Sequence, residues 1–379
     1  MMPFFYRAAV YVILLLSCNA AYATAESMLV KDKQPLNSTD KLLMLTPPSV
    51  LDKKLIPPSG DKHDFMSVGK YLWPNPATPN GLPYVYKDGM ARPGWETYGD
   101  YQSLDTMARA VIKLAKLYQN THKETYAKKA IELLRVWFLD PRTRMNPNMR
   151  YANAIPGSHE GTSSGVMHSL IFGAMVDVIP ALEASPAWTT DEQQQLRSWF
   201  TQFLTWLTQD KQGSKESDST NNHGSWYDVQ VVSIALYIGD TTLAKSILER
   251  SKEKRIARMI EPDGSQPLEL NRTLSMGYTL FSLSSFCRLA TMGESVGVDL
   301  WNYETKDGRS IHKALDYILP YFEENKPWPY PQINPLTPSD LKSAASMISQ
   351  AATIYHNPRY QKVADKIQSQ ADAASGTKH

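Results

Sequence analysis

Cysteine is scarce in this sequence of 379 residues, which has only Cys18 and Cys287. Cys18 falls in the apolar stretch at the N-terminus, so Cys287 is the one cysteine expected in the folded part, and a framework of intrachain disulfides is excluded. The neighbours of Cys287, residues 281–289, are rich in Phe and Leu. We therefore expect Cys287 to be a small buried side chain rather than a nucleophile.

An excess of charge is also lacking, because the formal net charge is only +2. The sequence has no block of like charges and no regular basic stripe, which argues against nucleic acid as a partner. A polyanionic substrate is compatible with this balance, since a few arginines concentrated in one cleft do not show in the total charge.

Metal-binding motifs are missing as well. The eight histidines are scattered, and neither an H-E-x-x-H pattern nor paired cysteines occur, which argues against a catalytic zinc site. No loop has the ligand spacing of a calcium site. We expect neither a metal nor another cofactor.

The N-terminus has the pattern of a secretory signal peptide at 1–25. Arg7 precedes an apolar run, residues 8–16, and Ala23-Thr24-Ala25 provides an A-x-A cleavage site. The apolar run is too short to span a bilayer, so we expect no integral membrane span and a location in the periplasm or outside the cell. The alternative is that the lipobox-like letters LLSC leave a lipid anchor on Cys18.

Composition divides the rest of the chain into an arm and a folded domain. Residues 26–62 are rich in Pro, Lys, Ser and Asp and indicate an extended N-terminal arm. The folded domain is expected at 63–375. Helical periodicity is its main signal, and it is clearest at 127–138 and 196–207, where apolar side chains recur at i, i+3 and i+4.

Further helices are expected throughout this domain, at residues 101–118, 164–183, 227–238, 241–250, 274–291, 311–322, 341–355 and 360–371. Strand-like alternation is scarce, and no repeat of fixed length occurs. Successive helices with short links stack as antiparallel hairpins, and the lack of a repeat favours a closed toroid over a solenoid. We predict an all-α fold of this kind.

Two helix starts have capping signals. Thr190 with Gln193 is a candidate capping box, and Thr337-Pro338 with Asp340 combines an N-cap, a first-turn proline and a favourable acid. By contrast, the polar run 211–220 has few helix signals.

The most informative segment is 221–228, NNHGSWYD, which places His223 between amides and aromatic rings. Such a cluster is costly to bury, so it indicates a functional site. A second dense segment, 261–272 (EPDGSQPLELNR), ends at Arg272 and is followed by Tyr278. Together they provide a base, a phenol, a guanidinium and an amide, the set that removes a proton beside a carboxylate and expels a leaving group.

A uronic-acid polymer suits this set. Its C5 proton lies next to the C6 carboxylate and is too weakly acidic until that carboxylate is neutralised. Arg272 and Asn222 suit the neutralisation, while His223 and Tyr278 suit removal of the proton and protonation of the departing O4. Which of these two is the base stays open, but a tyrosine base near neutral pH needs positive charge nearby.

Aromatic and proline-rich loops interrupt the helices and have the composition of a sugar-binding cleft. One of them, residues 71–76, reads YLWPNP. We expect substrate contacts from the aromatic and amide residues of these loops and of the two dense segments, namely Tyr71, Trp73, Trp226, Tyr227 and Gln266. Core packing is the competing interpretation for each tryptophan.

The same segments resemble the alginate-lyase-like polysaccharide lyases, which are helical-toroid enzymes of bacteria. The similarity rests on 221–227, on 261–266 with Arg272 and Tyr278, and on 63–74 (HDFMSVGKYLWP). It implies an incomplete (α/α) barrel and metal-independent β-elimination on alginate or a related polyuronate.

The resemblance also implies residue roles. By position it assigns neutralisation of the carboxylate to Asn222 and Arg272, and the base and acid roles to His223 and Tyr278. An acidic polysaccharide is then the expected partner, and we expect a monomer.

Other interpretations stay open. Asn222 and His223 would also suit a helix cap, and Arg272 an ion pair with Glu269 or Glu261. A toroidal glycoside hydrolase would need two carboxyl groups across a cleft, for which the candidates are Glu269 with Asp263 or Asp228. A non-catalytic periplasmic glycan-binding protein is the third interpretation. The sequence does not distinguish mannuronate, guluronate and glucuronate, nor endo from exo cleavage.

Overall fold

The structure is a computed structural model that describes residues 39–157 and 160–376. The predicted signal peptide, 1–25, and the first part of the predicted arm lie outside these residues. The start of the mature protein therefore stays a prediction.

Within the described ranges the chain forms two compact units. Unit 1 contains residues 219–232 and the chain from 241 onward, and unit 2 contains the chain up to 218 together with residues 233–240. Helix α9, Asn222–Ile238, starts in unit 1 and ends in unit 2. The predicted catalytic residues all belong to unit 1.

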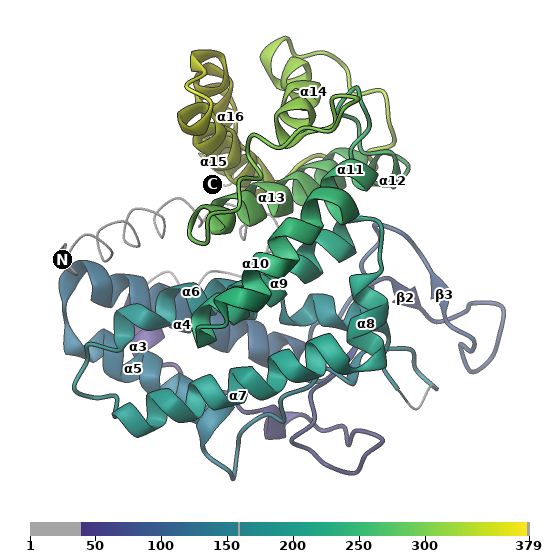
Figure 1. Cartoon of the computed structure of the whole chain (residues 1–379). Coiled ribbons are helices and arrows are strands. Elements are labelled where there is room, and N and C mark those ends of the chain that lie inside the picture. Colours follow the sequence, from purple (N-terminus) through teal and green to yellow (C-terminus); the bar gives the residue numbers. More distant parts are fainter. Residues whose placement is uncertain (1–38, 158–159, 377–379) are drawn as a thin grey trace, which may run out of the picture. The chain divides into compact units, whose positions relative to one another are not determined.

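Unit 2 is mainly helical (Figure 1). Helices α4 and α5 are joined at His122, whose left-handed φ of 54° reverses the chain, and α6 packs on α4. Its α-helices are α3 (Thr39–Leu43), α4 (Tyr101–Thr121), α5 (Glu124–Leu134), α6 (Ile171–Leu182), α7 (Thr190–Gln209) and α8 (Lys211–Ser217). Its 3-10 and π segments are η1 (Val50–Asp52), η2 (Arg135–Leu139) and η3 (Ser163–Ser169).

Unit 1 is organised around α13, Ser275–Glu294, which is buried along almost its whole length and contacts α10, α12, α14 and α15. Helices α15 and α16 form a hairpin, coloured yellow in Figure 1. The other elements of this unit are α10 (Thr241–Ser251), η4 (Lys252–Ile256), α11 (Ala257–Met259), α12 (Pro267–Leu270), α14 (Ile311–Glu323), α15 (Pro338–Ile354) and α16 (Pro358–Gly376). A helical segment is thus present at every position where periodicity predicted one.

Strands are few in the described part of the chain, as predicted, and all belong to unit 2. Strand β1 (Met66–Val68) pairs in parallel with β4 (Tyr151–Ala154). Strand β2 (Leu72–Trp73) pairs antiparallel with β3 (Val85–Tyr86). The second pair forms a hairpin that carries the predicted sugar contact Trp73.

The capping predictions have different outcomes. At α15 the side chains of Thr337 and Asp340 form the predicted reciprocal box. At α7 the prediction is shifted by one residue, because Thr189 is the N-cap and Glu192 closes the box. A carboxylate accepts from both the backbone N–H and the hydroxyl of Thr189, which a glutamine side chain one position later would do less strongly.

The run 211–220 is not poor in helix, because α8 occupies most of it. Asp210 caps this helix by accepting from Gln212 N at 2.9 Å. Its buried face is polar, and the Gln212 amide donates to the carbonyls of Arg150 and Gly161. A helix held by hydrogen bonds of this kind leaves no apolar period in the sequence.

The core of unit 2 is aromatic. Trp199 stacks on Phe203 with ring centroids 5.4 Å apart, and Phe138 and Phe172 meet Trp199 edge-on. By length and composition alone, one stretch of the described residues, Ser163–Leu182, is apolar enough to cross a bilayer, and 72% of its window is buried inside the fold. Burial of this kind is also found in an ordinary core helix.

The described end of the predicted arm is anchored on unit 2 by a buried ion pair. Lys53 Nζ lies 3.0 Å from Asp100 Oδ2, and both side chains are almost fully buried. Lys53 also donates to the carbonyls of Val50 and Lys62. The domain start at residue 63 stays a prediction, and the residues just before it contribute contacts to the same unit.

His168 is a buried histidine that links β1 and β4 to η3. Ser67 Oγ accepts from Asn153 N at 2.9 Å and lies 2.7 Å from His168 Nδ1. Burial lowers the pKa of His168 from 6.5 to about 3, and the charge of Lys70 adds to this effect. The neutral ring therefore accepts the hydroxyl proton of Ser67 at Nδ1.

Replacing His168 with Asn should reduce the dependence of the free energy of unfolding on pH at acid pH. Because the folded-state pKa lies below the unfolded value, wild-type stability should be full above about pH 6.5 and should fall at up to about 1.4 kcal/mol per pH unit below it. Asparagine keeps an acceptor for Ser67 but does not titrate. Urea unfolding of both proteins at several pH values measures the two slopes, and equal slopes would show that His168 is not the titrating group.

Candidate active site

The first turn of α9 is capped by Asn221. Its side-chain oxygen accepts from His223 N at 3.2 Å, and its carbonyl accepts from Gly224 N at 2.9 Å. The helix cap is therefore Asn221, and not Asn222 or His223. The side chains of Asn222 and His223 are left for other contacts.

Gly224 allows this turn to approach its neighbours closely. A Cβ atom placed there would lie 2.0 Å from Ser219 O and 2.4 Å from Arg255 Nη1. No larger residue fits without displacing that backbone carbonyl. The glycine next to His223 is thus required by packing.

Asn222 is held by the carboxylate of Glu269. Its backbone N–H donates to Glu269 Oε1 and its side-chain Nδ2 donates to Oε2, both at 2.7 Å. Both residues are almost fully buried. These bonds join the start of α9 to α12, across 47 residues of sequence.

Glu269 also lies near two other predicted catalytic residues. Burial is the largest influence and raises the pKa of Glu269, whereas the Asn222 bonds and the charges of Arg272 and His223 act in the opposite direction. A buried carboxylate needs such partners, since an unpaired one would be strongly destabilising. Asn222 is therefore bonded to this carboxylate, and the charges of Arg272 and His223 act on it.

Arg272 contacts Tyr278, the fourth predicted catalytic residue. Its guanidinium carbon lies 3.8 Å from the centre of the Tyr278 ring, and Tyr278 is 6% exposed. Glu261, the alternative partner considered for Arg272, pairs with Arg309 at 3.1 Å. The positive charge that a tyrosine base requires is therefore next to the ring.

Asp228, considered as a hydrolase carboxylate, belongs to a buried ion pair. Arg255 Nε lies 2.7 Å from Asp228 Oδ2, and both side chains are 0% exposed. Arg250 and Ser251 also bond to this carboxylate. With its oxygens fully engaged in the interior, Asp228 holds α9 against η4 and is not placed to meet a substrate.

Three of the predicted substrate contacts lie inside unit 1. Trp226 is fully buried, stacks on Phe281 at 4.8 Å and donates from Nε1 to the Phe281 carbonyl. This corrects the expectation of a sugar contact for Trp226, because no face of its ring is accessible. Tyr227 is also buried.

The two polar side-chain atoms of Gln266 have different surroundings. Gln266 is 2% exposed and donates from Nε2 to Thr279 O, which ties the start of α12 to α13. Its Oε1 atom is buried without a hydrogen-bond partner in the described chain. A direct contact with substrate stays a prediction for this residue.

Tyr71 and Trp73 belong to unit 2 and are half-buried at the β2–β3 hairpin. Lys87 Nζ lies 4.6 Å from the Trp73 ring centre, and Lys70 Nζ lies 5.4 Å from that of Tyr71. The sequence pattern indicated the aromatic rings but not these lysines. A lysine adjacent to an aromatic residue in a proline-rich loop is the signal that would have identified them.

Two further features contribute no catalytic groups. Cys287 is buried, as predicted, and burial raises the pKa of its thiol well above the usual range.

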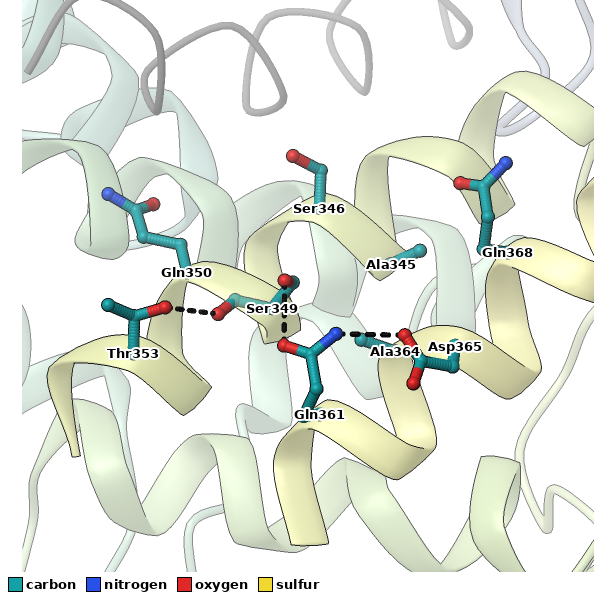
Figure 2. A pocket seen from close by; sticks show the side chains of 9 residues that line it. All are labelled: Ala345, Ser346, Ser349, Gln350, Thr353, Gln361, Ala364, Asp365 and Gln368. Atoms are coloured by element: carbon teal, nitrogen blue, oxygen red, sulfur yellow. Dashed lines mark hydrogen bonds between the residues drawn. The ribbon is translucent and has the colours of Figure 1, made fainter. Parts of the chain in front are cut away.

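A groove on the α15–α16 hairpin is lined by small and amide side chains (Figure 2). Asp365 is its one ionisable lining residue, so this groove lacks both the cation and the acid–base pair that the predicted chemistry needs. Within the described residues no three His, Cys, Asp or Glu side chains form a metal-ligand set.

Replacing Arg255 with Leu should destabilise the protein by about 3–5 kcal/mol, because it leaves the buried Asp228 carboxylate without its main partner. Arg250→Leu is the matched control. It removes the other arginine from the same carboxylate, but that side chain is 39% exposed, so the loss should be about 1 kcal/mol or less. Urea unfolding measures both changes, and similar losses for the two variants would contradict this assignment.

Known proteins resemble the chain in sequence and in fold. The alginate lyase family model matches residues 49–328. The crystal structure of an alginate lyase from Bacteroides ovatus has 36% sequence identity and a TM-score of 0.85, covering 95% of this chain and 94% of that chain. A variant of alginate lyase A1-III complexed with tetrasaccharide has 15% identity and a TM-score of 0.55, covering 89% of this chain and 88% of that chain, which is a likeness of fold alone. No curated protein matches the chain.

These matches confirm the predicted fold class, an all-α, incomplete (α/α) barrel of the helical-toroid type. The family match spans most of the chain and includes Asn222, His223, Glu269, Arg272 and Tyr278. The chain therefore belongs to the alginate lyase family and is a polysaccharide lyase.

Proposed function

We propose that this protein cleaves alginate or a related polyuronate by metal-independent β-elimination, as an exported monomer. The observation that carries the proposal is the grouping around Glu269, where Asn222 is bonded to the carboxylate and His223 and Arg272 lie near it. Arg272 in turn covers Tyr278. The family membership makes a glycoside hydrolase or a non-catalytic binding protein the weaker choice.

Arg272 and Asn222 are the proposed neutralisers of the uronate carboxylate. A guanidinium presents paired donors that match a carboxylate, and an amide adds a further donor. As C5 loses its proton, negative charge moves onto this carboxylate, and donors fixed in advance stabilise that charge most in the transition state. Glu269 fixes Asn222 before substrate arrives.

His223 and Tyr278 are the proposed proton-transfer groups. One takes the C5 proton, the electron pair of the C5–H bond forms the C4=C5 double bond, and the C4–O4 bond breaks. The other donates its proton to O4, so atoms and charge balance without an oxidant or a metal. Arg272 places a positive charge 3.8 Å from the centre of the Tyr278 ring, and both assignments of base and acid satisfy the balance.

The β2–β3 hairpin of unit 2 is the proposed binding surface for other sugar residues of the polymer. Aromatic faces pack on the C–H faces of sugars, and ammonium groups pair with uronate carboxylates. Tyr71 with Lys70, and Trp73 with Lys87, supply both groups in adjacent positions.

Tyr278→Phe should abolish elimination, because it removes only the phenolic hydroxyl and keeps the ring under Arg272. Loss of a general acid or base typically costs about 10²–10⁴ in rate. His223→Ala should lose activity to a similar degree. The measurement is the ultraviolet absorbance of the new double bond, followed on mannuronate-rich, guluronate-rich and glucuronate polymers.

A hydrolase would release reducing ends without that absorbance, and a binding protein would give neither signal. Adding EDTA should leave the rate unchanged if no metal takes part. The proposal fails if Tyr278→Phe keeps near-normal activity on the polymer that the wild-type protein cleaves best.

Glu269→Gln should lower kcat while the protein stays folded. Glutamine replaces one of the two acceptor oxygens with an NH2 donor, so one of the two Asn222 donors would face another donor. A neutraliser misplaced in this way can cost about 10²-fold in rate. Glu261→Gln is the matched control, because Glu261 pairs with the partly exposed Arg309 and should leave kcat within about twofold. Equal effects in the two variants would argue against a positioning role for Glu269.

Export is the remaining part of the proposal. When the full-length chain is produced in a bacterial host with an active secretion system, the mature protein should start at Glu26, or at a lipidated Cys18. Intact mass and N-terminal sequencing of the periplasmic and membrane fractions distinguish the two cleavage sites. A cytoplasmic product that keeps Met1 would contradict export.

A further inference from the structure

The chain between α14 and α15 in unit 1 is rich in proline and aromatic residues. Residues 326–331 read KPWPYP, and no helix or strand occurs between Glu323 and Pro338. Alternating prolines remove backbone donors and favour an extended chain. Residues 326–333 are called the proline–aromatic segment below.

This segment caps the helix that carries Tyr278. Helix α13 has no side-chain cap of its own at Leu274. Instead, Ser275 N donates to the Pro331 carbonyl at 3.0 Å, and Met276 N donates to Gln332 Oε1 at 2.9 Å. Two of the free N–H groups of the first turn are thereby satisfied from a distant part of the sequence.

Trp328 is attached to the same face of α13 as Tyr278. Its Nε1 donates to Ser275 Oγ at 2.7 Å, and Ser275 precedes Tyr278 by three residues. Residues at i and i+3 are neighbours on one face of a helix. The Trp328 ring is therefore held within about one helical turn of the candidate catalytic tyrosine.

Trp328 is the centre of an aromatic cluster. Tyr321 and Tyr330 contact it edge-on, with ring centroids at 4.7 and 5.1 Å, and Tyr330 OH lies 2.8 Å from Tyr317 OH. All four side chains are only partly buried. Hydrogen bonds and edge contacts fix these rings in place while part of each stays accessible.

Exposed aliphatic side chains lie in and near the proline–aromatic segment. In the described part of unit 1, Leu268 and Ile333 are the strongly exposed large hydrophobic residues, at 50% each. Ile333 N bonds to the Thr273 carbonyl, next to Arg272, and Leu268 lies on α12 shortly before it. Packing of the loop explains the anchoring bonds, but it does not explain apolar exposure concentrated beside the site.

We propose that the proline–aromatic segment is a saccharide subsite, in which Trp328 and Tyr330 stack on a uronate residue adjacent to the one that reacts at Tyr278. This proposal rests on the proposed function and adds residues that bind the polymer. Its occupant is an acidic sugar, because the rings offer faces for C–H groups and Lys326, which is exposed and lies 5.8 Å from the Tyr321 ring centre, offers a cation for the carboxylate.

Charge also orients this occupant. The carboxylate of Asp263 acts electrostatically on Tyr317, whose pKa is raised mainly by burial. An anionic sugar is repelled by this carboxylate and attracted by Lys326. The uronate carboxylate is therefore expected on the side of Lys326.

The test is the dependence of KM on the ring at position 328. Trp328→Ala should raise KM for the polyuronate about tenfold, the size expected for loss of one aromatic stacking contact, and the increase should be larger for long oligouronates than for the shortest one that is cleaved. Trp328→Phe keeps a ring but removes the donor to Ser275, so its KM should stay within about threefold of wild type.

A matched control separates the subsite from general loss of an aromatic residue. Tyr303 is a partly buried tyrosine of unit 1 with Lys252 Nζ 5.9 Å from its ring centre, and it bonds to Glu253 instead of α13. Tyr303→Ala should leave KM within about twofold. Thermal unfolding midpoints show whether each variant is folded.

Binding without turnover tests the subsite independently of the reaction. Calorimetry with an oligouronate should give an affinity about tenfold weaker for Tyr278→Phe with Trp328→Ala than for Tyr278→Phe alone. If the wild-type protein eliminates no polyuronate but this difference is seen, the proposed reaction fails and the subsite stands. Equal affinities, or a Trp328→Phe variant as weak as Trp328→Ala, would overturn the subsite and leave Trp328 as an anchor of α13.

Discussion

The buried carboxylate of Glu269 is the interaction on which the candidate site depends. It accepts two hydrogen bonds from Asn222 and lies close to the charges of Arg272 and His223. Removing a carboxylate from water costs several kcal/mol unless such partners compensate for it. The same bonds that offset this cost fix the start of α9 against α12, so the fold of unit 1 and the position of the amide have one physical cause.

Cations beside aromatic rings are the second recurring arrangement. Arg272 covers Tyr278 in unit 1, and Lys87 lies over Trp73 in unit 2. Each pair holds a positive charge beside an aromatic ring. A chain with a net charge of only +2 can in this way offer local positive charge to a polyanion, because the charge is concentrated at chosen positions rather than spread over the surface.

The sequence predicted most long helices because their buried faces are apolar and therefore periodic. It missed α8, whose buried face is held by polar contacts such as those of Gln212, and it displaced the start of α7, where Thr189 rather than its neighbour is the cap. For the site, residue types in two dense segments were enough to select the candidates. The helical periodicity did not indicate that Trp226 faces the core. No local sequence pattern predicts the contact between Asn222 and Glu269, because these residues come together only when the chain folds.

The most direct test of this account is the structure of Tyr278→Phe with a bound oligouronate. We predict that Arg272 and Asn222 bond to the carboxylate of the reacting sugar. Either C5 lies within reach of His223 and O4 lies beside the ring at position 278, or C5 lies beside that ring and O4 within reach of His223. Glu269 should keep both bonds to Asn222 in the complex. A sugar carboxylate bound away from Arg272 and Asn222, in a complex that retains the bound chain, would contradict the central claim that these residues neutralise it.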